Sequence, residues 1–230
     1  MADRQQYISL WVNTVGAGIF DYFLRLLMRL NIDIGLIKGF LEPLEGEALF
    51  QYAGEVSNMG PILEVGSYCG KSTVYLGTAC QVAGVSLYAV DHHRGSEEHQ
   101  PGEAYYDERL LDIETGVIDS FREFRRTIGA AGLEDTVVPV VTSSEVASHN
   151  WVTPLAMVFI DGGHSPSAAM TDYRSWAGHI LRGGLLAIHD IFPDPTEGGQ
   201  APYDILKLAL ASGLFEEIDR VKTLSVLRRV

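Results

Sequence analysis

Cysteine is scarce in this sequence, where Cys69 and Cys80 are the only two among 230 residues. They lie near the start and the end of one predicted helix and could not easily meet, which excludes a disulfide framework. Met1 to Arg4 are not followed by the apolar core and small-residue cleavage site of a signal peptide. We therefore expect a cytoplasmic protein in a reducing compartment.

Positive charge is also scarce, with 17 lysines and arginines against 30 acidic residues and a net charge of -13. The phosphates of a nucleic acid would repel such a chain, so we expect no nucleic-acid partner.

The sequence lacks a long uninterrupted apolar run. Its most apolar stretch, Ser9 to Ile37, contains too many polar groups for a membrane span, namely Asn13, Asp21, Arg25, Arg29 and Asp33. We therefore expect no membrane partner. The apolar residues of this stretch recur at helical spacing, at Ile19, Phe20, Phe23, Leu24, Leu27 and Leu30. They predict an amphipathic helix that either joins copies of the chain into a homo-oligomer or folds back as a roof over the active site.

The most informative stretch is Ile62 to Thr73, ILEVGSYCGKST, which predicts a buried strand, a glycine turn and a helix start. Gly66 and Gly70 have no side chain, so a ligand can lie against the backbone of this turn. The combination is typical of a small-molecule binding site.

Two nucleotide-binding motifs fail here on spacing. A phosphate-binding P-loop needs four residues between its first glycine and the Gly-Lys-Ser triplet, whereas three separate Gly66 from Gly70. The dinucleotide motif G-x-G-x-x-G fails because Ser67 to Cys69 supply no second glycine. A neutral or cationic adenosine ligand therefore fits better than a pyrophosphate.

Strands and helices alternate after residue 60, which predicts a parallel sheet with helices on both faces. The predicted strands are Pro61 to Gly66, Ser86 to Asp91, Thr136 to Val141, Leu155 to Asp161 and Gly184 to Asp190. The predicted helices are Gly70 to Ala83, Val117 to Gly132, Pro166 to Leu181 and Tyr203 to Ser212.

The chain ends differently, with strands predicted over Phe215 to Val221 and Leu224 to Arg229. Only two residues join them, so they must be antiparallel. The predicted fold class is thus α/β, a doubly wound, mostly parallel seven-stranded sheet with a C-terminal antiparallel hairpin. Residues 1–58 are predicted to form an N-terminal helical cap, with a helix from Glu45 to Ser57, and residues 59–230 the ligand-binding domain. Within that domain, the polar segment 92–116 is predicted to be a lid or substrate loop.

Asp91 ends the second strand, about 25 residues after the glycine turn, where a carboxylate can accept both hydroxyls of a ribose. Glu64, Gly66, Gly70 and Asp91 together resemble the S-adenosylmethionine site of class I methyltransferases. The resemblance extends from about Leu36 to the C-terminus, and its best-matching pieces are ILEVGSYCGKST, YAVDHH, FIDGGHS and LRGGLLAIHD. It implies a Rossmann-like methyltransferase fold and a transferase similar to the catechol-type and natural-product O-methyltransferases.

The resemblance also implies which residues bind the cofactor. Related methyltransferases contact the adenine after the third strand, which makes Ser144 and Glu145 candidates, although helix capping by Ser143 or Ser144 explains the same residues. His92 is expected to frame the ribose or the adenine. The predicted S-adenosylmethionine ligands are Glu64, Gly66, Ser67, Tyr68, Gly70, Ser72, Asp91, His92, Ser144, Glu145 and Asp161.

Ionisable residues follow the fourth and fifth parallel strands, which the topology places side by side. Asp161, His189 and Asp190 are predicted to converge there as ligands of a divalent metal ion, Mg or Mn. The catechol-type enzymes have a carboxylate where this chain has His189, which also admits Fe or Zn. The ion would lower the pKa of a substrate hydroxyl.

A metal-free mechanism competes with this one, because His164 or His189 could act as a general base. The candidate catalytic residues are therefore Asp161, His164 and His189.

Three functional classes remain open. The first is a metal-assisted O-methyltransferase that acts on a small hydroxylated acceptor. The second keeps the cofactor but methylates nitrogen or transfers another group. The third is a non-enzymatic adenosine-ligand binder that assembles through its N-terminal helix.

Overall fold

The computed structural model describes residues 30–103 and 105–230. The predicted amphipathic helix, and the assembly predicted through it, fall largely on residues 1–29, outside the described part. None of the helices that the structure describes is long and apolar enough to cross a membrane.

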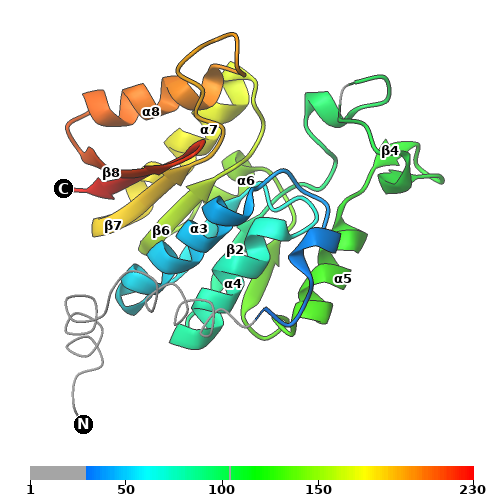
Figure 1. The fold of residues 1–230 in the computed structure, drawn as a ribbon, viewed down its shortest axis with the longest axis horizontal. Coiled ribbons are helices and arrows are strands. Elements are labelled where there is room, and N and C mark those ends of the chain that lie inside the picture. The colour runs from blue at the N-terminus through cyan, green and yellow to red at the C-terminus, as the bar shows by residue number, and fades with distance from the viewer. Residues whose placement is uncertain (1–29, 104) are drawn as a thin grey trace.

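A seven-stranded sheet runs through the centre of the molecule (Figure 1). Its strand order is β5-β2-β1-β6-β7-β9-β8. The first five strands pair in parallel, whereas β9 is antiparallel to both of its neighbours. The predicted fold class, including the C-terminal antiparallel hairpin, is confirmed. The strands are β1 Ile62–Val65, β2 Leu87–Val90, β5 Val137–Val140, β6 Leu155–Ile160, β7 Ile180–Ile188, β8 Phe215–Val221 and β9 Leu224–Arg229.

Helices cover both faces of the sheet. On one face α3, α4 and α5 enclose a core that includes Leu49, Leu76 and Phe124; Figure 1 shows α3 and α4 side by side there. On the other face α7 and α8 enclose a core around Trp176 and Leu206. The helices are α3 Pro43–Val56, α4 Lys71–Ala83, α5 Phe121–Ala131, α6 Ser144–Ser148, α7 Pro166–Trp176 and α8 Ala201–Ala211, with short 3-10 helices at Ile34–Leu36, Ser57–Met59, Glu97–His99, Glu108–Leu110 and Ala177–His179.

Local sequence accounts for several element ends. Pro43 occupies the first turn of α3, where its missing N–H costs nothing, and Glu42 and Glu45 form a capping box. Gly84 ends α4 in the left-handed conformation that glycine adopts without strain. The strand β6 is buried along its whole length, as expected for a central parallel strand with helices on both faces.

Two predicted helices are corrected. The helix predicted from Val117 begins only at Phe121, because Val117–Ile118 form a short strand, β4, that pairs with β3 at Leu111–Asp112. The helix predicted to reach Leu181 ends at Trp176, and Ile180 already begins β7. The segment that carries β4 extends outward from the body of the molecule (Figure 1).

Candidate functional site

The glycine turn between β1 and α4 brings the backbone of two neighbouring strands into close contact. A side chain at Gly66 would place its Cβ 2.0 Å from the carbonyl oxygen of Asp161, so the fold itself requires glycine there. Tyr68 has a φ of 45°, which is uncommon for a residue with a side chain. Such conformations cost energy and often occur at functional sites.

Asp91 holds this turn in place from the end of β2. Its Oδ2 accepts a hydrogen bond from the N–H of Tyr68 at 2.8 Å, and its Oδ1 accepts one from the N–H of His93 at 2.7 Å. Each carboxylate oxygen has a second lone pair for a further donor. Asp91 is half-buried and lines a large cavity, so a ligand can supply that donor.

The cavity beside Asp91 has a volume of about 930 Å³ and lies beyond the carboxyl ends of the parallel strands. Open α/β sheets bind their ligands at this edge. The predicted cofactor residues that line it are Gly66, Tyr68, Asp91, His92, Ser144, Glu145 and Asp161.

Ser143, rather than Ser144, caps the helix after β5. The Ser143 hydroxyl accepts from the N–H of Val146, whereas the Ser144 hydroxyl accepts from the indole N–H of Trp176 at 3.0 Å. Asp172, which the sequence analysis did not single out, also lines the larger cavity, and burial raises its pKa to about 6.

Glu64, a predicted cofactor ligand, lines neither cavity. It is fully buried, and its two oxygens accept hydrogen bonds from the hydroxyls of Ser72 at 2.5 Å and Thr73 at 2.6 Å. Burial raises its pKa to about 7. These two hydrogen bonds join β1 to the first turn of α4. Glu64 therefore stabilises the glycine turn from the core side and does not reach either cavity. Gly70 likewise lines neither cavity.

A smaller cavity of about 290 Å³ adjoins the larger one and shares part of its wall. Two predicted cofactor residues, Ser67 and Ser72, line only this smaller cavity. Aromatic side chains form much of its remaining wall, with Phe40 and Tyr105 in edge contact at 5.0 Å between ring centroids. The shared wall contains Gly66, Tyr68, Ser96, Glu98, His99, Asp161, Gly162 and His164.

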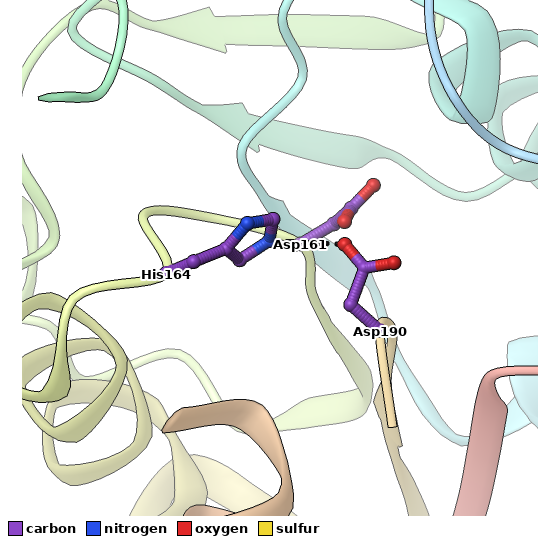
Figure 2. Close-up of side chains that lie close together, drawn as sticks. All are labelled: Asp161, His164 and Asp190. Carbon is purple, nitrogen blue, oxygen red and sulfur yellow. Dashed lines mark ion pairs between the residues drawn. The ribbon is translucent and has the colours of Figure 1, made fainter. Parts of the chain in front are cut away.

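Asp161, His164 and Asp190 converge where the two cavities meet, and Figure 2 shows their side chains side by side. One ligand atom of each lies within 4.8 Å of the others. His164 Nε2 lies 3.0 Å from Asp190 Oδ2, and His164 Nδ1 lies 2.8 Å from Glu98 Oε1. Asp190 has a φ of 57°, a second uncommon backbone conformation at this edge.

Hydrogen bonds between the side chains of this cluster shift their pKa values and so determine their charges. The hydrogen bond to Asp190 raises the pKa of His164 to about 9, although burial opposes the shift. Burial raises the pKa of Asp190, but hydrogen bonds from His164 and His189 outweigh it and hold that pKa well below its usual range. Without a bound cation, His164 is therefore an imidazolium between two carboxylates at neutral pH.

The predicted ligand set contained His189, and the structure brings His164 to the cluster instead. His189 is buried, and both of its ring nitrogens are already bonded to carboxylates: Nε2 lies 3.0 Å from Glu45 Oε2, and Nδ1 lies 3.1 Å from Asp161 Oδ1. Burial lowers the pKa of His189, but the charge of Asp161 and the bonds to Asp161, Asp190 and Glu45 outweigh it and raise that pKa far above its usual range. Both ring nitrogens of His189 are therefore occupied by carboxylates in the interior, and neither is free for a metal ion or a substrate proton. His189 holds the Asp161 carboxylate from the core side of the sheet.

Glu45 of α3 is a further residue that the sequence analysis missed. It is 1% exposed, and its Oε1 also accepts hydrogen bonds from the N–H and hydroxyl of Thr223 in the β8–β9 turn. Burial raises its pKa, but His189 outweighs that effect and lowers the pKa to about 2. Glu45 thus joins the hairpin and α3 to the residues behind the cluster.

The sheet order, the glycine turn with Asp91 at the next strand end, and the terminal hairpin together define a class I methyltransferase fold. A family model described as a methyltransferase domain matches residues 63–191, more than half of the chain. The chain therefore belongs to this methyltransferase family.

Solved structures share the fold at low sequence identity. The O-methyltransferase NovP has a TM-score of 0.67 and 13% identity, over 91% of this chain and 99% of its own. TomG from Streptomyces achromogenes, an O-methyltransferase involved in tomaymycin synthesis, has a TM-score of 0.58 and 14% identity over 100% of both chains. The methyltransferase PaMTH1 of Podospora anserina has a TM-score of 0.59 and 12% identity, over 83% of this chain and 80% of its own.

Proposed function

We propose that this protein is an S-adenosylmethionine-dependent methyltransferase that acts on a hydroxyl oxygen of a small molecule. The position of Asp91 carries the proposal, because its carboxylate fixes the glycine turn and lines the larger cavity. A carboxylate at this strand end suits the two hydroxyls of a ribose. TomG was solved in complex with S-adenosylmethionine and PaMTH1 with S-adenosylhomocysteine, which supports the same ligand here.

The sheet order supports one direction for the proposed ligand. Ser144 follows β5, Asp91 follows β2 and Asp161 follows β6, so these residues stand in sequence along one edge. An adenosine whose ribose is bound by Asp91 would direct its base toward Ser144 and its sulfur toward Asp161. When bound, S-adenosylmethionine supplies a methyl group on a positively charged sulfur, ready for transfer to a nucleophilic oxygen.

The smaller cavity suits the acceptor. Phe40, Tyr105 and Phe192 give it apolar walls, and Asp161, His164 and Asp190 contribute to the same lining. A small hydroxylated molecule there would have its oxygen beside both the cluster and the sulfur end of the larger cavity. Holding two reactants in line can lower a barrier by up to roughly 7 to 11 kcal/mol.

Asp161, His164 and Asp190 would also hold a divalent metal ion. Two carboxylates and an imidazole suit Mn or Fe better than Mg, which prefers oxygen ligands alone, and their ligand atoms already lie close together. When bound, such an ion lowers the pKa of an acceptor hydroxyl. A metal-free base mechanism fits less well, because a His164 with a pKa of about 9 is protonated at neutral pH.

Calorimetry tests the cofactor. We expect the protein to bind S-adenosylmethionine and S-adenosylhomocysteine with micromolar or tighter affinity, and to bind NAD and ATP at least about tenfold more weakly. The reason is that the glycine turn is one residue too short for a phosphate loop. Binding of ATP or NAD without binding of S-adenosylhomocysteine would overturn the proposal.

Metal titration tests the cluster. Demetallated protein should bind Mn²⁺, and Asp190→Ala and His164→Ala should each lower that affinity at least about tenfold, because each removes a ligand. Asp204→Ala, on the exposed side of α8, is the matched control and should leave the affinity unchanged. The proposed ligand set is wrong if both cluster variants bind Mn²⁺ as tightly as the control.

A further inference from the structure

His99, in the segment after β2, lies in the wall that the two cavities share. Its Nδ1 is 2.8 Å from the hydroxyl oxygen of Ser96. The side-chain amide of Gln100 donates to the carbonyl oxygens of Arg94 at 3.1 Å and Ser96 at 3.0 Å, which holds the turn before the histidine in place. The segment therefore fixes the position of the His99 ring.

One nitrogen of this ring has no partner. His99 Nε2 is buried and forms no hydrogen bond with any of the described residues. Burial lowers the pKa of His99, so at neutral pH the ring is uncharged, with one nitrogen a donor and the other an acceptor. Buried polar groups are usually paired, so an unpaired nitrogen in a cavity wall is a candidate contact for a ligand.

Charged side chains in the same part of the site already have partners. His164 Nδ1 lies 2.8 Å from Glu98 Oε1, and Lys38 Nζ lies 2.6 Å from Asp107 Oδ2. His99 differs from them, because it presents an uncharged hydrogen-bonding atom that no described residue uses.

Aromatic rings surround His99 in the wall of the smaller cavity. The centroid of its ring lies 5.1 Å from that of Tyr68, 6.3 Å from that of Tyr105 and 6.4 Å from that of Phe40. Phe40 is 61% exposed and Tyr105 is 47% exposed, so the protein leaves much of both rings uncovered. Uncovered rings beside a cavity favour a flat, aromatic ligand, which they contact by stacking or edge to face.

From these features we propose that His99 is a specificity-determining residue for an aromatic acceptor with a second kind of polar group. The acceptor ring lies against Phe40, Tyr68 and Tyr105, and a polar substituent outside the reacting hydroxyls bonds to His99 Nε2. The inference rests on the proposed function, because it places the reacting hydroxyl at the cluster of Asp161, His164 and Asp190.

The size and polarity of the smaller cavity narrow the acceptor further. Its volume of about 290 Å³ lies at the lower limit of ligand pockets, which suits a single ring. A sugar fits less well, since each of its hydroxyls needs a polar partner and the aromatic wall supplies few.

Four small molecules test the proposal by calorimetry, each titrated into the full-length protein with S-adenosylhomocysteine and Mn²⁺ present. Catechol has two adjacent hydroxyls, which both face the cluster. Pyrogallol and hydroxyquinol add a third hydroxyl at different ring positions. A cyclohexanediol with adjacent hydroxyls keeps the diol of catechol and removes the aromatic ring.

Two variants separate the contributions of the histidine. His99→Phe keeps a flat ring and removes both nitrogens. His149→Phe is the matched control, because His149 is exposed and lines neither cavity.

We expect the wild-type protein to bind pyrogallol or hydroxyquinol about tenfold more tightly than catechol, a gain that one hydrogen bond can supply. His99→Phe should lose this gain and bind catechol within about twofold of wild type, which also shows that the variant folds. His149→Phe should keep the gain. Cyclohexanediol should bind at least about tenfold more weakly than catechol.

Three results would overturn the inference: equal or absent binding of the three ring compounds by the wild-type protein, a gain that His99→Phe retains, or cyclohexanediol binding as tightly as catechol. Failure of the proposed function looks different, since the wild-type protein would then not bind S-adenosylhomocysteine, and the inference would fall with it.

Discussion

Replacing Asp91 with alanine is expected to lower the affinity for S-adenosylhomocysteine about 100-fold. A hydrogen bond to a charged group contributes about 1.5 to 3 kcal/mol, and a 100-fold change corresponds to about 2.8 kcal/mol. The substitution removes the proposed acceptor for two ribose hydroxyls. It also releases the N–H groups of Tyr68 and His93, which Asp91 now holds at 2.8 and 2.7 Å. Calorimetric titration of wild type and variant measures the difference.

The matched control is Asp194→Ala. Asp194 is an exposed aspartate after β7 that lines neither cavity, and its carboxylate accepts hydrogen bonds from Thr196. We expect the control to bind as wild type does, and thermal unfolding establishes that both variants are folded. If folded Asp91→Ala binds within threefold of the control, the ribose does not lie at Asp91.

The sheet could be predicted from the sequence because its determinants are local. Each parallel strand is a short apolar run that ends at a polar residue, such as Asp91 or Asp161. The antiparallel hairpin could be predicted because only two residues, Lys222 and Thr223, separate its strands. Val117 and Ile118 were assigned to the wrong element, because two residues carry no periodicity and β4 exists only by pairing with β3.

The site was harder to predict because strand alternation decides which face a side chain reaches. Glu64 shares a face with Ile62, which packs in the core under α3 and α4, and so it points away from the cavities. His189 follows the same alternation from Leu185 and Ala187 toward that core. Asp190 then turns into the cavity through its positive φ, a conformation that aspartate adopts more readily than most residues but that strand alternation alone does not predict.

The partnership of Glu45 with His189 could not be predicted, since 144 residues separate the two in the sequence. Glu45 occupies the first turn of α3, where an acidic residue is ordinary and favours the helix dipole. Only the packing of α3 over the end of β7 turns this capping residue into the partner of a buried imidazolium.

Replacing Glu45 with alanine is therefore expected to lower the free energy of unfolding by about 3 to 5 kcal/mol, the usual cost of removing one partner of a buried ion pair. The variant leaves His189 charged, with its Nε2 facing a void. It also removes the bonds from Thr223 and from the N–H of Glu42. Urea unfolding at neutral pH, followed by circular dichroism, measures the change.

Glu55→Ala is the control on the same helix, because Glu55 is exposed and its carboxylate accepts a hydrogen bond from the Gln51 side chain at 3.1 Å. It should change stability by no more than about 0.5 kcal/mol.

A double-mutant cycle with Glu45→Gln and His189→Gln then isolates the pair, since contacting residues show an interaction energy of about 0.5 to 3 kcal/mol. If Glu45→Ala costs no more than Glu55→Ala and the cycle shows no coupling, the buried pair does not stabilise the back of the site. A coupling in that range, by contrast, would mean that α3 and the β8–β9 turn fix the imidazole whose other nitrogen lies 3.1 Å from Asp161.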